Sequence, residues 1–140
     1  QRKKTLQKKD RIFSYRSNNL YYTVSASDVN KYLKQFGKFT AKNFRTWGAN
    51  IEFIVQVNNH CKNQKLSSKK EIDNCIKKSI EEVACKLHNT SAVCKSNYLD
   101  PEIINLFVEN PNKFRNIFNV KKINKDKINS KYINFLKSLI

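Results

Sequence analysis

The tyrosine in the segment NTSAVCKSNYLD, residues 89–100, is the side chain in this sequence best placed to do chemistry. Tyr98 stands two residues before an Asp-Pro-Glu helix start and nine residues after Asn89. A phenolic oxygen can act as a nucleophile and form a covalent intermediate with a phosphate. A tyrosine beside a helix cap is more often an aromatic anchor of the core. The local sequence alone therefore favours packing.

The charge of the chain indicates its partner. The 140 residues include 28 Lys and Arg against 11 Asp and Glu, a formal net charge of +17. The positive residues are spread through the chain and alternate with Tyr, Phe and Ile, so the folded body itself is cationic. Such an imbalance is usually retained because a polyanion compensates for it. We therefore expect the chain to bind nucleic acid.

Several chemistries are disfavoured by what the sequence lacks. Gly37 and Gly48 are its two glycines, whereas a Walker loop or a dinucleotide fingerprint needs glycines at several fixed positions. The carboxylates are scattered apart from Glu81 with Glu82 and the helix start at Asp100, so no cluster could hold two magnesium ions for phosphodiester cleavage. We expect no cofactor and no metal. A phosphate reaction would then require a side-chain nucleophile.

The cysteines, at positions 61, 75, 85 and 94, form no Cys-x-x-Cys, and no signal peptide precedes them. We predict free thiols in a reducing compartment, acting as small buried hydrophobes. The alternative is a zinc site built from His60, Cys61, Cys85 and His88, although this spacing fits no standard finger. The longest apolar stretch, IEFIVQV, is far shorter than the ~20 residues that cross a bilayer. We expect no membrane association.

The elements that must position Tyr98 are predicted to be mainly α. Residues 12–24 are β-prone and indicate an extended segment or a small hairpin. Helices are predicted from cap residues and from the helical spacing of apolar residues at about 26–36, 40–61, 69–88, 90–97, 101–109, 112–118 and 127–139. Gly48, inside the second helix, suggests that another backbone comes close there. The predicted organisation is a basic arm and extended segment at 1–24, followed by a helical domain at 25–140.

Two long motifs carry a resemblance to a known family. The segment LYYTVSASDVNKYLKQFGKFTAKNFRTWGANIEF is followed, from residue 89, by NTSAVCKSNYLDPEII. In this order and separation they resemble the catalytic domain of type IB DNA topoisomerases of the short poxvirus, giant-virus and bacterial kind. The resemblance covers roughly residues 20–107, about the second half of that domain. It implies the helical C-terminal half of the fold shared by these enzymes and the tyrosine recombinases.

The resemblance also implies roles for three residues. Tyr98 would be the nucleophile that forms a 3′-phosphotyrosyl bond with one DNA strand. Arg45 would clamp the scissile phosphate, since its planar fork suits two nonbridging oxygens. Asn89 stands where poxvirus enzymes and recombinases have histidine, and its amide would donate one hydrogen bond to the phosphate. The alternatives are a surface arginine at position 45 and a simple helix cap at position 89.

Three further residues beside these motifs, Lys42, Thr90 and Lys95, are expected to contact the DNA backbone. In a chain this basic, the two lysines are otherwise most often solvated charges. Lys42 also bears on the choice of family. Recombinases usually have a histidine three residues before the clamping arginine, and here Lys42 occupies that place before Arg45. The resemblance therefore favours a topoisomerase over a recombinase.

The predicted activity is relaxation of supercoiled double-stranded DNA without ATP or metal. The family's upstream arginine and lysine have no matching motif here, and the chain begins with Gln1. We therefore expect the C-terminal part of a catalytic domain, a monomer that is inactive without its upstream part. The alternatives are a tyrosine recombinase and a DNA-binding module without catalysis. The richness in Lys, Asn and Ile is typical of an AT-rich genome, which fits a large DNA virus. The expected location is intracellular and reducing: for a viral protein, a viral factory or virion, or the host nucleus or cytoplasm.

Overall fold

The computed structural model describes residues 13–18, 20–120 and 123–140. It confirms the predicted fold class, because helices dominate and the described strands form one short hairpin. The chain divides into two compact units, residues 1–44 and 45–140, which we describe separately. The predicted basic arm at residues 1–11 lies outside the described residues.

The first unit contains the predicted hairpin. Strand β1 (Ser14–Ser17) pairs antiparallel with strand β2 (Leu20–Thr23), and the register places Tyr15 opposite Tyr22. The rings of these two tyrosines stack with their centroids 5.3 Å apart. Asn18, with a φ of 47°, turns the chain between the strands in the left-handed region that asparagine tolerates.

Helix α1 (Ala26–Leu33) follows the hairpin and starts at a capping box. The Ser25 side chain accepts from the backbone of Asp28, whose carboxylate accepts from the backbone of Ser25. The helix continues as a 3-10 turn, η2 (Lys34–Phe36), and ends at Gly37, whose φ of 143° favours glycine. The apolar stripe of this helix is exposed rather than buried against a core.

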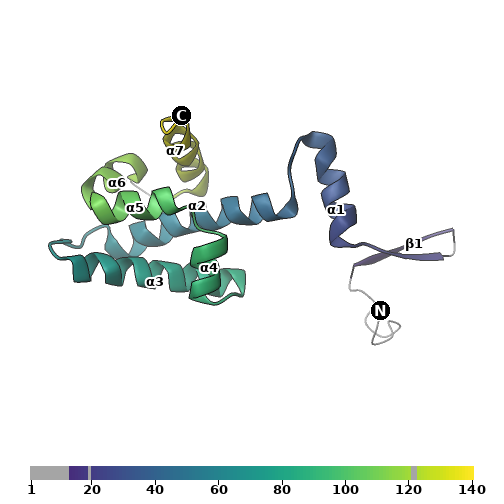
Figure 1. Cartoon of the computed structure of the whole chain (residues 1–140), viewed down its shortest axis with the longest axis horizontal. Coiled ribbons are helices and arrows are strands. Elements are labelled where there is room, and N and C mark those ends of the chain that lie inside the picture. The colour runs from purple at the N-terminus through teal and green to yellow at the C-terminus, as the bar shows by residue number, and fades with distance from the viewer. Residues whose placement is uncertain (1–12, 19, 121–122) are drawn as a thin grey trace. The chain divides into compact units, whose positions relative to one another are not determined.

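The second unit is built around residues 45–61 of the long helix α2 (Ala41–Cys61). In Figure 1, α3 and α4 lie below α2, and α6 and α7 lie above it. Every residue from 49 to 58 is buried, so this part of α2 is covered on all sides. The other helices of this unit are α3 (Lys69–Leu87), α4 (Ser91–Asn97), α5 (Pro101–Glu109), α6 (Pro111–Phe118) and α7 (Lys125–Lys137).

The core of the second unit is apolar and rich in phenylalanine. Phe107, Phe114 and Phe118 are fully buried. The ring of Phe114 contacts both of the others. Its centroid lies 5.0 Å from that of Phe107 and 4.8 Å from that of Phe118. Phe118 then contacts Phe135 of α7 at 5.7 Å. This row of rings joins α5, α6 and α7 into one body.

A buried carboxylate ties three helices together. Glu52 of α2 accepts hydrogen bonds from Lys86 of α3, from Lys125 of α7 at 2.8 Å and from Gln56 at 2.6 Å. Burial alone would raise the pKa of Glu52, but the bonds from Lys125, Lys86 and Gln56 outweigh it and lower the pKa to about 2. The carboxylate therefore stays charged through the ordinary pH range.

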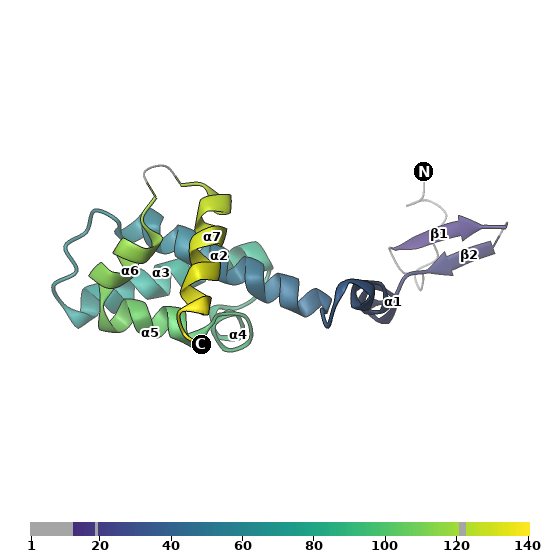
Figure 2. The same cartoon turned by 90° about the horizontal axis from the view of Figure 1, so that it is seen from above.

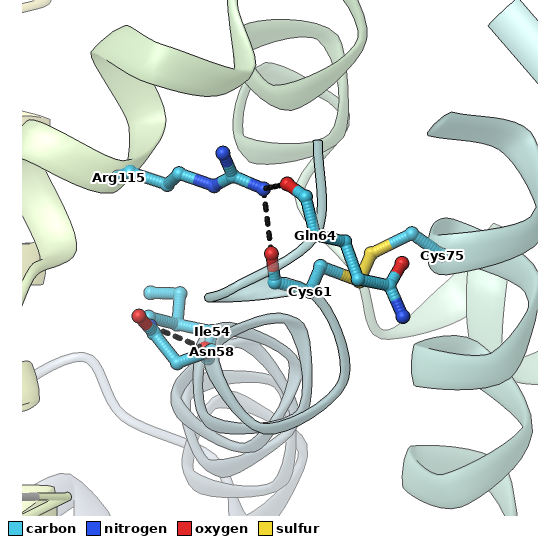
Figure 3. Close-up of a disulfide and its surroundings, with 6 residues drawn as sticks. All are labelled: Ile54, Asn58, Cys61, Gln64, Cys75 and Arg115. Atoms are coloured by element: carbon cyan, nitrogen blue, oxygen red, sulfur yellow. Dashed lines mark hydrogen bonds between the residues drawn. A yellow bond between two sulfur atoms is a disulfide. The ribbon is translucent and has the colours of Figure 1, made fainter. Parts of the chain in front are cut away.

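The expectation that all the cysteines are free thiols is wrong for two of them. Cys61, at the end of α2, forms a disulfide with Cys75 of α3 (Figure 3). Cys85 and Cys94 are free. Arg115 of α6 donates to the carbonyl oxygens of Cys61 and, at 2.7 Å, Gln64, so it closes the C-terminal end of α2 next to the disulfide. No local pattern predicts this pairing, because Cys61 and Cys75 stand 14 residues apart.

One packing expectation is also wrong. Gly48 is exposed, and a Cβ placed on it would meet no described heavy atom within 4 Å, so no other described backbone comes close. Phe44 and Val108 have the helical spacing of the buried residues beside them but are themselves exposed. None of the helices in the described part of the chain has both the length and the apolar character that a membrane span requires. The same residues contain no group of three potential His, Cys, Asp or Glu ligands for a metal.

Candidate active site

Tyr98 sits in a short break between two helices. Its backbone N–H donates to Cys94 O at 3.1 Å and ends α4, whereas Asp100 caps the start of α5. Leu99, between them, is buried and anchors the break in the core. Tyr98 itself is half-buried, so its ring packs against the protein without being sealed inside it. The short break thus fixes the backbone and leaves the side chain at the surface.

Arg45 contacts the ring of Tyr98 directly. The guanidinium carbon lies 5.1 Å from the ring centroid, a cation–π contact. The same guanidinium donates to the carbonyl oxygen of Leu87, the last residue of α3. Carbonyls at a helix C-terminus lack intrahelical partners and attract positive charge. Arg45 of α2 therefore joins the ends of α3 and α4.

Asn89 lies in the turn that connects α3 with α4. His88, in the left-handed region with a φ of 53°, ends α3, and the N–H of Asn89 donates to Ala84 O at 2.9 Å. The Nδ2 atom of Asn89 is buried and has no hydrogen-bond partner among the described residues. The predicted residues Arg45 and Tyr98 are thus in direct contact. Asn89 has no direct contact with them among the described residues. It is connected to them through its own turn, which begins at Leu87, the residue whose carbonyl oxygen accepts from Arg45.

The three predicted DNA-contact residues are all exposed. Thr90 is the N-cap of α4, and its hydroxyl accepts from Val93 N at 3.3 Å. Lys95 lies in the last turn of α4, on the rim of a groove of about 440 Å³ between α3, α4 and α5. Lys42 lies in the first turn of α2 and belongs to the first unit.

Cys94 lies beside this cluster. Its thiol is fully buried, and this burial raises its pKa, although the positive charge of Arg45 opposes the effect. The thiol therefore stays neutral at ordinary pH. A neutral neighbour leaves the charge of Arg45 available to an anion.

Asn50 is a site residue that sequence reasoning missed. It is 1% exposed, and its Nδ2 donates to Tyr98 O at 3.1 Å and to Thr46 O at 2.9 Å. Its Oδ1 accepts from Asp100 N at 2.8 Å. One amide thus binds the backbone on both sides of Leu99 and fixes the break that carries Tyr98. A signal existed: a polar residue between Ala49 and Ile51, inside a buried stretch of helix, must find partners.

The arrangement places a phenol beside a guanidinium. The turn that follows Leu87 carries an amide donor, Asn89 Nδ2, with no hydrogen-bond partner among the described residues. Guanidinium and amide N–H groups are the donors that phosphate oxygens accept from most readily. A phenolic oxygen next to such donors has the chemistry of a nucleophile toward a phosphodiester.

Comparison with known proteins finds one family and one relative that this chain resembles. Residues 1–103 match the family described as the eukaryotic DNA topoisomerase I catalytic core. Over 112 residues the chain is 32% identical to DNA topoisomerase 1B of Acanthamoeba polyphaga mimivirus. That alignment covers 75% of this chain and 33% of the relative, so the chain spans about a third of the relative's length. The family match includes Arg45, Asn89 and Tyr98. It starts further toward the N-terminus than the motif resemblance at residues 20–107, and it ends before α6.

Proposed function

Because this chain belongs to the type IB DNA topoisomerase family, we propose that it carries the nucleophile of an enzyme that relaxes supercoiled duplex DNA. Tyr98 Oη attacks the phosphorus of one phosphodiester, the bond from phosphorus to the 5′-oxygen breaks, and a 3′-phosphotyrosyl bond forms. The phenol loses its proton and the leaving 5′-oxygen gains one. After the nicked duplex has turned, the 5′-hydroxyl attacks in reverse and releases Tyr98. One phosphate ester replaces another, so neither ATP nor a metal ion is consumed.

The contact between Arg45 and Tyr98 is the observation that carries this proposal. A guanidinium 5.1 Å from the phenol ring can reach the phosphate that the phenol attacks. In the structure, the guanidinium donates to the carbonyl of Leu87. A phosphate is a stronger, charged acceptor and takes two parallel hydrogen bonds from the guanidinium fork. DNA binding would therefore move Arg45 from the carbonyl to the scissile phosphate.

Asn89 supplies the second donor in this proposal. Its buried Nδ2 has no partner among the described residues, and an unpaired buried amide costs free energy until an acceptor arrives. A phosphate oxygen is such an acceptor once the side chain of the half-buried Asn89 turns toward the surface. The unmet hydrogen bond would thus be completed by the substrate and would favour binding of the reacting phosphate.

The duplex would be held by charge. The net charge of +17 and the exposed side chains of Lys42, Thr90 and Lys95 would meet the DNA backbone. Binding should weaken steeply with salt, because each neutralised phosphate releases counterions. We also propose that cleavage needs the rest of the catalytic core, which would protonate the leaving 5′-oxygen, and that this chain acts as a monomer within it. This chain alone would bind DNA but not cleave it.

Trapping on a suicide DNA substrate tests the proposal, using this chain alone and the longest natural form of the protein that carries it. The longer form should become covalently attached to DNA, and Tyr98→Phe should abolish the adduct while DNA binding persists. Tyr32→Phe, at an exposed tyrosine of α1, is the matched control and should react normally. An adduct in Tyr98→Phe would assign the nucleophile to another residue. DNA binding without any adduct would indicate a binding module.

A further inference from the structure

Helix α7 lies beyond the matched residues 1–103 but contacts both segments of the site. Figure 2 shows it crossing α2. Trp47, two residues after Arg45, donates from its indole Nε1 to Asn129 Oδ1 of α7 at 2.8 Å. The indole also packs on the ring of Tyr132, with the centroids 4.8 Å apart. The stretch of α2 that carries Arg45 is therefore held by α7 through one hydrogen bond and one ring contact.

Helix α7 also contacts the segment that carries Tyr98. The hydroxyl of Tyr132 donates to Asp100 Oδ2 at 3.4 Å, two residues after Tyr98. The other oxygen of Asp100 caps α5 by accepting from Glu102 N at 3.0 Å. Tyr132 is 3% exposed, and burial and the neighbouring charge of Asp100 raise its pKa, so its hydroxyl keeps the proton that it donates.

Helix α7 is itself firmly anchored. Ile128 and Phe135 are buried in the core. Lys131 Nζ donates to Ile117 O of α6 at 2.9 Å, and Lys125 Nζ donates to Glu52 of α2 at 2.8 Å. A helix fixed at several points along its length can transmit a constraint to the residues it touches.

We infer that Asn129 and Tyr132 are positioning residues for DNA cleavage. They contact neither substrate nor reacting atoms, but they hold Trp47 and Asp100, each two residues from a proposed catalytic side chain. Arg45 and Tyr98 come from separate segments, and the mutual geometry of two reacting groups governs rate steeply. One helix that binds both segments fixes that geometry. This inference rests on the function proposed above.

Single-turnover adduct formation at saturating DNA tests the inference in the longest natural form of the protein. Asn129→Leu removes the acceptor of the indole N–H and should slow adduct formation about tenfold without changing the Kd for DNA. Asn129→Asp keeps an acceptor oxygen and should restore the rate to within about threefold of the unaltered protein. Tyr132→Phe, which keeps the ring, should show a smaller loss of rate. Asn134→Leu makes the matched change at an exposed position of α7 and should leave the rate unchanged.

The rate at saturating DNA separates positioning from stability, because a merely structural contact would lower the unfolding temperature without changing the rate of folded protein. Asn129→Leu reacting at the unaltered rate, or Asn129→Asp failing to rescue it, would overturn the role of α7 alone. An equal loss in Asn134→Leu would do the same. If the unaltered protein formed no adduct, the proposed function would be wrong and this inference would fail with it.

Discussion

Replacing Asn50 with aspartate should separate the backbone geometry of Tyr98 from the chemistry of its side chain. An ionised aspartate keeps an acceptor for Asp100 N but loses the donor that now binds Tyr98 O at 3.1 Å and Thr46 O at 2.9 Å. A buried carbonyl left without its donor costs about 1–3 kcal/mol. The new carboxylate would also face two carbonyl oxygens at a position that is 1% exposed, which adds a desolvation cost. We expect a total loss of about 2–4 kcal/mol at neutral pH.

The matched control is Asn58→Asp on the same helix. Asn58 is 6% exposed and donates from Nδ2 to Ile54 O at 2.8 Å, the same one-turn contact that Asn50 makes with Thr46. It has no hydrogen bond to the segment around Tyr98. Its replacement should therefore cost about 1–2 kcal/mol less than that of Asn50. Urea denaturation measures both losses.

The kinetic expectation is sharper than the thermodynamic one. Asn50→Asp should slow adduct formation by more than about tenfold at saturating DNA, because the backbone of Tyr98 loses its anchor, whereas Asn58→Asp should react at nearly the unaltered rate. The loss of stability in Asn50→Asp should also depend on pH. Burial raises the pKa of the introduced carboxyl above its unfolded value of about 3.9. The part of the loss that comes from the buried charge is therefore absent below that pH and grows as the pH rises toward the folded-state pKa. Equal rates in the two variants would refute the reasoning.

The other predictions concern the proposed catalytic role of Arg45 and two structural contacts. Arg45→Lys keeps the charge but loses the planar fork, so adduct formation should fall at least about tenfold in a single-turnover assay, with the Kd for DNA little changed. Glu52, with its pKa lowered to about 2 from 4.5, stabilises the fold above pH 4.5 and loses that effect as the pH falls toward 2. The loss of this stabilisation amounts to only about 1–2 kcal/mol, because both lysine partners are more than half exposed and solvent screens their charges. Denaturation across this range should show the loss in the unaltered chain and not in Glu52→Gln. Cys61→Ser should lower the free energy of unfolding by about 3 kcal/mol under non-reducing conditions, whereas Cys85→Ser should not.

Local sequence patterns predicted the elements of this fold because helix ends and periodicity are local properties. The capping box at Ser25 and the Asp100-Pro101 start of α5 require only neighbouring residues, and both could be predicted. Partners across the fold could not. The apolar stripe of α1 has the right spacing for a buried face, yet it is exposed. Periodicity shows which side chains share a face and does not show what covers that face.

In the candidate site, too, the residues within a motif could be predicted and the contacts between distant segments could not. Arg45, Asn89 and Tyr98 could be predicted because they lie in long motifs that resemble a family. Asn50 and Trp47 lie in the same motif, but their hydrogen bonds join positions 48, 50 and 82 residues apart. No spacing rule predicts such pairs. The Cys61–Cys75 disulfide was missed for the same reason, since four cysteines allow several pairings.

The polar contacts of α2 explain how a site made from distant segments keeps one geometry. At successive positions along this helix, Arg45 binds the end of α3, Trp47 binds α7 and Asn50 binds the break between α4 and α5. Glu52, two residues after Asn50, binds α3 and α7 again. Because an α-helix has 3.6 residues per turn, these side chains point in different directions from one rigid axis. Each segment that forms the site is therefore bound to the same helix. A substitution that shifts α2 should slow cleavage before it unfolds the protein.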